Sequence, residues 1–319
     1  MWFEANKIGF NNKENHYRAF WKKNIVWNYV TDDNKIYYIS TDGNVITPNI
    51  YANTNGGFGA NIVSNTYTNG MGVITFDGPV TRIGVGTFLQ KKLKDIFIPA
   101  SVTGIYDDAY ESTGVNIVHL PKNVTDLSGY SCIYADIYYV SVDPENSAYE
   151  VYKDSIINSS TRELIIGTSK SVLDSGISAI GVAAFSGRKG ISSITIPQGI
   201  TKVKAFTFAW SNLSSVVIPS SVTSIDREAF SITKLTSVTI PSSVNQISYY
   251  AFSDCVNLVD IRVNATVPPT IPEPDEYDGS IFGVVGSVSG RQIKVPASKV
   301  NTYKNATGWS YYASEIVAQ

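Results

Sequence analysis

The chain has 319 residues, a net charge of −2 at neutral pH and a charged fraction of 16%. This charge gives no electrostatic case for nucleic-acid binding, which usually needs a strongly basic face, and no segment approaches the roughly 18 apolar residues of a membrane span. The two cysteines, Cys132 and Cys255, lie too far apart to form the disulfide framework of a small secreted domain.

Residues 1–71 do not fit any internal repeat, and they begin with a leader rich in aromatic and basic side chains. Its aromatic residues include Trp2, Phe3, Trp21 and Trp27. One interpretation is an N-terminal cap over the exposed apolar end of a repeat array, which every such array needs. Another is a docking segment for a partner protein, because tryptophan, tyrosine and arginine suit interface anchors. The sequence leaves both open, since one segment can serve both purposes.

Two further features of this region lead to expectations. The start of the chain lacks the uninterrupted apolar run of roughly 7–15 residues that a signal peptide needs. If Met1 is the natural start, we expect no export by the usual route. Further along, Lys35–Ser40 and Val45–Thr47 flank an Asp42-Gly43 pair. This pair supplies the positive φ angles of a tight turn, so we predict a β-hairpin.

From residue 72 to residue 264 the chain repeats itself. Within two runs, a proline that follows an aliphatic residue recurs every 22 positions, and an aromatic residue follows most of these prolines by eleven positions. The prolines are Pro99 and Pro121 in the first run and Pro197, Pro219 and Pro241 in the second. The aromatic residues are Tyr110, Phe208, Phe230 and Phe252, and two degenerate copies pair Asp77 with Phe88 and Asp174 with Phe185.

The copy from Leu213 to Phe230 shows what each position does. Side chains alternate across a strand, so Val216 and Ile218 share the core side. Pro219 then removes a backbone donor and ends the strand. One such unit cannot bury its own apolar face, whereas stacked copies can, because each strand pairs with the next and each ring packs on the next ring.

These copies resemble the BspA-like branch of leucine-rich repeats, known from bacterial surface proteins and from phages that infect such bacteria. The resemblance rests on residues 93–110, 191–208, 213–230 and 235–252. It implies a mainly β leucine-rich-repeat solenoid with short turns or helical segments, and a packing role for Cys255. Residues 293–296 and 303–311 resemble the C-terminal cap of such arrays. We therefore expect an N-terminal cap or docking region at 1–71, repeats at 72–264, and a C-terminal loop and cap at 265–319.

The regular spacing breaks between Pro121 and Asp174, which are 53 residues apart instead of two periods of 22. The segment near residues 133–171 resembles the hairpin insertion common in this family. We expect a local bulge there, with the solenoid continuing through it.

The sequence contains little that points to catalysis or to a cofactor. Its two histidines, His16 and His119, have no cysteine nearby in sequence, and no phosphate-binding loop or zinc motif occurs. Residues 273–278 carry four carboxylates that could hold calcium, but they lack the spacing of an EF-hand, and a solvated loop fits the neighbouring prolines better. We therefore predict a protein that is not an enzyme and needs no cofactor.

One face of the strands is the candidate binding surface. Alternation places one position of each copy on the outer side of its strand, and His119 at this position is expected to be exposed. The residues at this position are Phe97, His119, Thr195, Val217 and Thr239. Neighbouring outward positions are rich in serine and threonine, which could contact protein or glycan or could simply form a soluble strand face.

Together these features favour adhesion or recognition without catalysis. The leading hypothesis is a bacteriophage virion component, such as a head fibre, a decoration protein or a tail-fibre protein, that binds a host surface or other virion proteins. The alternative is a bacterial cell-surface adhesin of the same family that binds a host protein or glycan. A second copy of the chain is a further candidate partner, whereas nucleic acid and membrane insertion are not expected.

Overall fold

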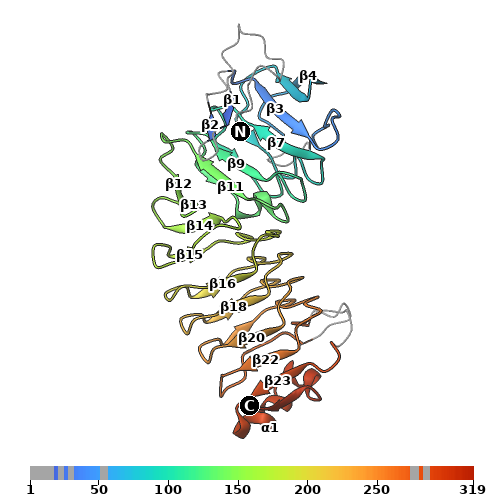
Figure 1. The fold of residues 1–319 in the computed structure, drawn as a ribbon, viewed down its shortest axis with the longest axis vertical. Coiled ribbons are helices and arrows are strands. Elements are labelled where there is room, and N and C mark those ends of the chain that lie inside the picture. The colour runs from blue at the N-terminus through green and yellow to red at the C-terminus, as the bar shows by residue number, and fades with distance from the viewer. Residues whose placement is uncertain (1–17, 21–24, 28–31, 51–56, 274–279, 283–287) are drawn as a thin grey trace. The chain divides into compact units, whose positions relative to one another are not determined.

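The computed structural model describes residues 18–20, 25–27, 32–50, 57–273, 280–282 and 288–319. These residues divide into two compact units, 1–151 and 152–319. Both are built mainly of short β-strands that stack layer upon layer (Figure 1). The predicted mainly β solenoid is therefore confirmed. No helix among the described residues combines the length and apolar character needed to span a membrane.

In unit 1 the long strands begin with an antiparallel sheet and continue as parallel layers. The sheet order is β4 (Ile62–Thr68), β5 (Met71–Phe76), β3 (Lys35–Ser40) and β7 (Leu93–Phe97). β9 (Ile117–Leu120) pairs in parallel with β11 (Tyr139–Val142). A second ladder joins β6 (Arg82–Ile83), β8 (Gly104–Ile105) and β10 (Asp126–Leu127), and β1 (Arg18–Phe20) pairs with β2 (Ile25–Trp27). A 3-10 turn, η2, covers Gly129–Cys132.

The hairpin predicted between Lys35–Ser40 and Val45–Thr47 is wrong. A turn does follow β3, with Gly43 at φ 75°, but both edges of β3 are already paired with β5 and β7. The backbone of Ile46 is instead held by side chains. Its amide donates to the Tyr38 hydroxyl at 3.1 Å, and its carbonyl accepts from the Asn65 amide at 2.8 Å.

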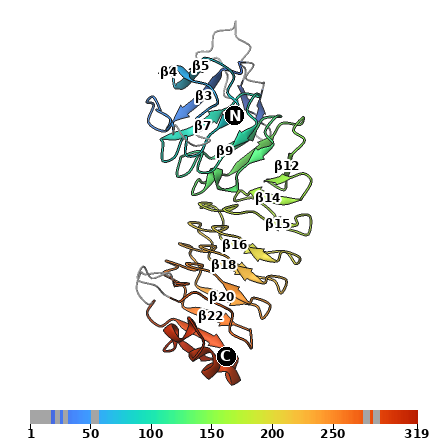
Figure 2. The same cartoon turned by 180° about the vertical axis from the view of Figure 1, so that it is seen from behind.

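In unit 2 the strands again form two ladders, which Figure 2 shows from behind. The first ladder begins with β16 (Ser193–Thr195), which pairs with β18 (Ser215–Val217). It continues as a four-stranded sheet in the order β20 (Ser237–Ile240), β22 (Asp260–Val263), β23 (Gln292–Val295) and β24 (Ile316–Ala318). The second joins β17 (Lys202–Val203), β19 (Ser224–Ile225) and β21 (Gln246–Ile247).

The irregular segment also contains strands. β12 (Tyr149–Tyr152) lies at the boundary between the units, and β13 (Ser155–Asn158) is antiparallel to β14 (Glu163–Ile166). β14 then pairs in parallel with β15 (Ala179–Ile180). Lys153 and Asp154, between β12 and β13, have φ angles of 46° and 60°. Two consecutive positive φ angles are typical of the tight type I′ hairpin turn.

A column of parallel rings fills the core of unit 2. Phe185, Phe208, Phe230 and Phe252 are at most 1% exposed. Successive ring centroids lie 5.5, 5.4 and 5.3 Å apart, with interplanar angles of 13°, 12° and 5°. The aromatic position of the repeat therefore supplies a continuous stack. Cys255 lies beside this column, 4% exposed, with its thiol donating to the Phe230 carbonyl at 3.1 Å.

The aromatic turns carry a ladder of their own. In six layers the residues two before and two after the ring have positive φ, a conformation that side chains other than glycine adopt at a cost. These alternating conformations aim three amides per turn at the next layer. The amides of Phe206, Phe208 and Trp210, for example, donate to the carbonyls of Arg227, Ala229 and Ser231.

This geometry predicts that glycine stabilises the exposed left-handed positions. Ser112 has φ 50° and is exposed, whereas the equivalent residue of a later layer is Gly187 at φ 77°. Replacing Ser112 with glycine should raise the free energy of unfolding by about 0.5–1 kcal/mol, because the relief of backbone strain exceeds the entropy that glycine adds to the unfolded chain. Urea unfolding measures the change. Gly187→Ser is the reciprocal control and should destabilise; two changes of equal sign would contradict the explanation.

The C-terminal end of unit 2 is closed by short helical turns. They are η3 (Ala297–Lys299), α1 (Val300–Lys304) and η4 (Trp309–Tyr312). Tyr303 and Trp309 are at most 1% exposed, and their polar atoms donate to the carbonyls of Ala265 at 2.8 Å and Pro269 at 2.7 Å. These turns therefore cover the apolar end of the array, and the buried hydroxyl of Tyr303 and the indole N–H of Trp309 both form hydrogen bonds.

Candidate functional site

The outer face of unit 2 is an exposed strip of uncharged side chains. We use the name "outer face" for the positions on β16, β18 and β20 that point away from the core. Thr195, Val217 and Thr239 lie there and are exposed, Val217 by 55%. Of the five residues predicted for a binding face, these three are placed as expected.

Most hydroxyls of this strip remain available to a ligand. The Ser214 hydroxyl donates to the Ser192 carbonyl at 2.9 Å, so it serves the fold. The other exposed hydroxyls form no hydrogen bond with any described residue. They are those of Ser192, Ser193, Thr195, Ser215, Thr236, Ser237 and Thr239. The strip can therefore offer donors and acceptors without a net charge.

Towards the C-terminus the strip becomes charged. Asp260 on β22 and Lys294 on β23 form an ion pair at 3.0 Å. Arg262, also on β22, is exposed and lies in register between Thr239 of β20 and Lys294 of β23. The uncharged part of the outer face is thus limited to the layers of β16, β18 and β20.

In unit 1 the same positions are covered, which corrects two expectations. Phe97 is only 9% exposed, because the edge of the array is occupied by β3 and β5. It packs with Tyr37 and Met71, and Ile39 and Val73 lie against this cluster. Phe97 is therefore not an exposed contact residue.

His119 is half-buried rather than exposed. Its Nδ1 atom lies 2.9 Å from the hydroxyl of Ser141 on the neighbouring strand. Burial lowers the pKa of His119 to about 4, although the Asp143 carboxylate acts in the opposite direction. A base with this pKa is poorly matched to proton transfer at neutral pH. The pair is thus better described as a packed polar contact than as catalytic machinery.

The lowered pKa predicts a pH dependence of stability. An unfolded histidine titrates near 6.5, so the unfolded state binds more protons than the folded state between about pH 6.5 and 4. Stability is complete above this window and falls as the pH falls through it. His119→Asn keeps a polar atom near Ser141 but does not titrate. The wild type should lose roughly 3 kcal/mol more than this variant across the window in urea unfolding; parallel profiles would contradict the assignment.

Two predicted sites fall largely outside the described residues. Trp2, Phe3 and Trp21 lie outside these residues, and Trp27 is described only by its backbone, as the last residue of β2. Of the acidic segment 273–278, only residue 273 is described. Among the described residues, no group of three or more potential metal ligands comes together.

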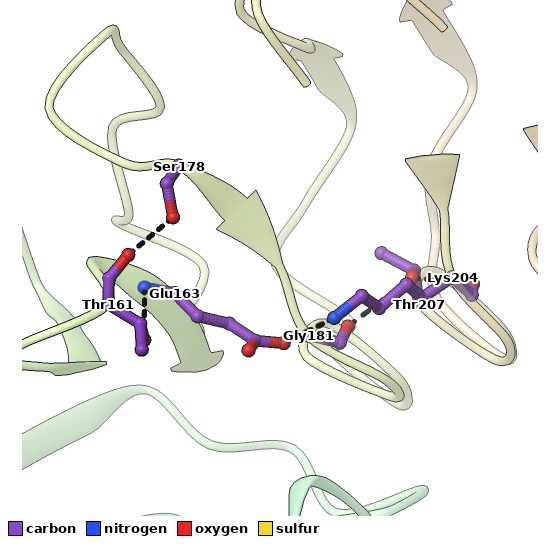
Figure 3. Close-up of polar contacts among 6 residues, drawn as sticks. All are labelled: Thr161, Glu163, Ser178, Gly181, Lys204 and Thr207. Carbon is purple, nitrogen blue, oxygen red and sulfur yellow. Dashed lines mark hydrogen bonds and ion pairs between the residues drawn. The ribbon is translucent and has the colours of Figure 1, made fainter. Parts of the chain in front are cut away.

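An ion pair ties the irregular segment to the regular repeats (Figure 3). Glu163 on β14 and Lys204, which follows β17, are 2.6 Å apart and about one-third exposed. Lys204 reaches across Gly181, where a Cβ atom would lie 2.7 Å from the Leu164 carbonyl oxygen. The Thr207 hydroxyl donates to the Lys204 carbonyl at 2.7 Å. Such a partly exposed pair contributes at most about 1 kcal/mol and is best read as a positioning contact.

Sequence reasoning missed the buried Arg188. This side chain is 1% exposed and donates from Nε to the Gly167 carbonyl at 2.7 Å. Later layers have Ser211 and Thr233 at the same position, three residues after the ring, where they make short hydroxyl contacts. Aligning the repeats on their rings could have revealed Arg188, because at this position a long basic side chain replaces the small hydroxyl residue of the later layers, beside the irregular segment.

Comparison with known proteins identifies the repeats. The BspA type leucine rich repeat region matches in six copies, over residues 60–139 and 155–270. No curated protein shows significant similarity to the chain. The pneumococcal vaccine antigen PcpA is similar in structure, with 16% identity, a TM-score of 0.57, and coverage of 75% of this chain and 66% of that one.

A leucine-rich cell surface protein from Faecalibacterium prausnitzii is also similar, with 20% identity, a TM-score of 0.54, and coverage of 66% of this chain and 59% of that one. The chain thus spans less than two thirds of either protein, and at these identities the likeness concerns the fold alone. The repeat match covers more than half of the chain, so this protein belongs to the BspA-type leucine-rich repeat family.

Proposed function

We propose that the protein is a non-enzymatic adhesion protein of a bacterial cell surface that binds a partner protein through the outer face of unit 2. The observation that carries the proposal is the row of exposed Thr195, Val217 and Thr239 among unbonded hydroxyls. An uncharged, rigid strand face suits contact with protein, because the repeats hold its side chains at a fixed spacing.

The comparisons support the cell-surface alternative over the virion hypothesis. One similar structure is described as a leucine-rich cell surface protein and another as a pneumococcal vaccine antigen. Nothing in them indicates a virion protein. The aromatic leader at residues 1–30 is a second candidate contact, and its deletion should leave binding by the outer face unchanged if the two act independently.

A binding array of host extracellular proteins and glycans tests the proposal. The triple variant Thr195→Lys, Val217→Lys and Thr239→Lys should lose at least about tenfold in affinity for the protein bound by the wild type. The matched control changes Gln198, Ser220 and Ser242, exposed residues that directly follow the prolines of the same repeats, to lysine. Equal loss in both variants, or binding by the wild type to no protein on the array, would contradict the outer-face site.

A further inference from the structure

The antiparallel sheet of unit 1 ends in a long strand with a neighbour on one side only. β4 is the outer strand of this sheet (Figure 2) and, among the described residues, pairs with β5 alone. The two-residue turn Asn69-Gly70 joins the two strands, so Thr68 pairs with Met71. An edge strand of this kind offers a row of backbone donors and acceptors to a further strand.

The hydrogen bonds of β5 show how its backbone groups alternate between its two neighbours. The Phe76 amide donates to the Asn34 carbonyl at 2.9 Å, next to β3. The Asp77 amide donates to the Asn61 carbonyl at 3.0 Å, next to β4. Because these directions alternate along an antiparallel strand, every second residue before Asp77 bonds to β4. These residues are Met71, Val73 and Thr75.

The outward backbone groups of β4 follow from this alternation. Ser64, Thr66 and Thr68 lie opposite the three residues of β5 that bond to β4, so their amides and carbonyls serve the sheet. The amides and carbonyls of Asn65 and Tyr67 point the other way, and neither forms a backbone hydrogen bond within the described chain. The edge thus presents two outward-facing residues with one inward-facing residue between them.

This edge lacks most of the features that prevent pairing with another strand. Natural edge strands are commonly protected by lysine, by proline or by inward-pointing charges. No charged residue occurs between Asp42 and Asp77, and β4 contains no proline. A β-bulge lies at the start of the strand, between Ile62 and Ser64, so Ser64–Thr68 is left regular. The regular part is therefore uncharged and open to pairing.

The outward groups of β4 match those of a second β4 that runs in the opposite direction. A two-fold axis through Thr66 places Asn65 of one copy opposite Tyr67 of the other, and each such pair exchanges two backbone hydrogen bonds. Thr66 then faces its own counterpart, and Ser64 faces Thr68. All three are exposed hydroxyl residues, and such cross-strand pairs stabilise sheets. A charged edge would bring like charges together here, whereas this edge has none.

We propose that two copies of the chain associate through β4, as an antiparallel pair with its two-fold axis at Thr66. The sheet of one copy then continues into the sheet of the other. A strand edge of this length buries less than the roughly 1,000 Å² of a stable specific interface, so the pair is weak in solution and strengthens where copies are held close together. This contact goes beyond the proposed function, because it joins copies of this chain and leaves the outer face unused.

Cysteine cross-linking tests the pairing and its register. In a non-hydrogen-bonded antiparallel pair the Cα atoms lie about 4.5 Å apart, within the reach of a disulfide. Thr66→Cys should therefore give a disulfide-linked dimer under mild oxidation. Thr68→Cys, an exposed position of the same strand, is the matched control and should not, because the axis separates the two copies of this residue by about 13 Å along the strand. Thr68→Cys mixed with Ser64→Cys should cross-link. The native Cys132 and Cys255 are buried and do not compete.

Sedimentation without a cross-linker guards against linkage by chance collision. Between about 10 μM and 1 mM the average mass of the wild type should rise towards that of a dimer. Thr66→Lys and Thr66→Asp should each associate about tenfold more weakly or less, because like charges meet at the axis, and their equimolar mixture should recover the dimer. Thr125→Lys, at an exposed position of unit 1 outside this sheet, should behave as the wild type.

Three results would each overturn the proposal. The wild type could stay monomeric over the whole concentration range, Thr68→Cys could cross-link as readily as Thr66→Cys, or the mixture of oppositely charged variants could stay monomeric. The first result stands on the unmodified chain and does not depend on the folding of any variant.

Discussion

Replacing Phe230 with alanine should lower the free energy of unfolding by about 3–5 kcal/mol. Phe230 is completely buried and has a parallel ring on each side, Phe208 at 5.4 Å and Phe252 at 5.3 Å. Its removal leaves a cavity in the middle of the column that neighbours cannot fill, because the three backbone bonds of each aromatic turn hold the layers at a fixed spacing.

The measurement should resolve position as well as size. An array can unfold in parts, so urea unfolding of the full chain is combined with hydrogen exchange across residues 200–255. The control is Val217→Ala in the same repeat, which removes a 55% exposed side chain and should change stability by less than about 0.5 kcal/mol. If Phe230→Ala behaved like this control, the stacking position of the repeat would be wrongly assigned.

The core of the repeats could be predicted because its sequence signal is periodic. Ile218, assigned by the repeat to the core side, is only 8% exposed, and the stacking residue Phe230 is completely buried. A position that recurs every 22 residues has the same neighbours in each layer, so the role inferred for a residue in one copy applies to the equivalent residue in the others. The conformations of the turns were not predictable in this way. Positive φ occurs at Phe206, Glu228 and Tyr250. These three side chains are chemically different, so the residue type at this position does not predict the conformation.

The ends and the interruption of the array were predicted less well, because there the layers lack identical neighbours. Asp42-Gly43 does form a turn, but pairing of β3 with β5 and β7 outweighed the local hairpin signal. The Asn69-Gly70 pair between β4 and β5 marked the hairpin that exists, with φ angles of 52° and 81°. Phe97 was placed on the correct side of its strand, yet its exposure depends on residues distant in sequence.

The candidate binding surface, too, was predictable within the regular repeats and not where the repeats are interrupted. Thr195, Val217 and Thr239 lie within regular layers, so strand alternation was enough to place them on the surface. His119 holds the same position in its own repeat, but it lies beside the interrupted segment, where Ser141 on the neighbouring strand packs against it. The unpaired edge of β4 could not be predicted in this way either, because the order of strands in its sheet depends on pairing between residues far apart in sequence.

Replacing Glu315 with alanine should cost about 3–5 kcal/mol, because it leaves a buried guanidinium without its carboxylate. Arg291 and Glu315 are only 8% and 16% exposed, and they form two bonds, Nε to Oε2 at 2.7 Å and Nη2 to Oε1 at 3.0 Å. The guanidinium also lies 4.2 Å from the ring centroid of Phe282. The pair therefore connects the residue that precedes β23 to the residue that precedes β24.

A double variant that lacks both charges distinguishes this loss from the net contribution of the ion pair to stability. Arg291→Met with Glu315→Leu removes both charges together and should cost much less than Glu315→Ala, since a buried ion pair and an apolar pair of similar size are often nearly equal in stability. The control is Glu145→Ala, which breaks an exposed pair with Lys122 and should cost less than about 1 kcal/mol. Hydrogen exchange should localise the Glu315→Ala effect to β23 and β24. A double variant as unstable as Glu315→Ala would mean that shape at this position, and not the uncompensated charge, holds the end of the array.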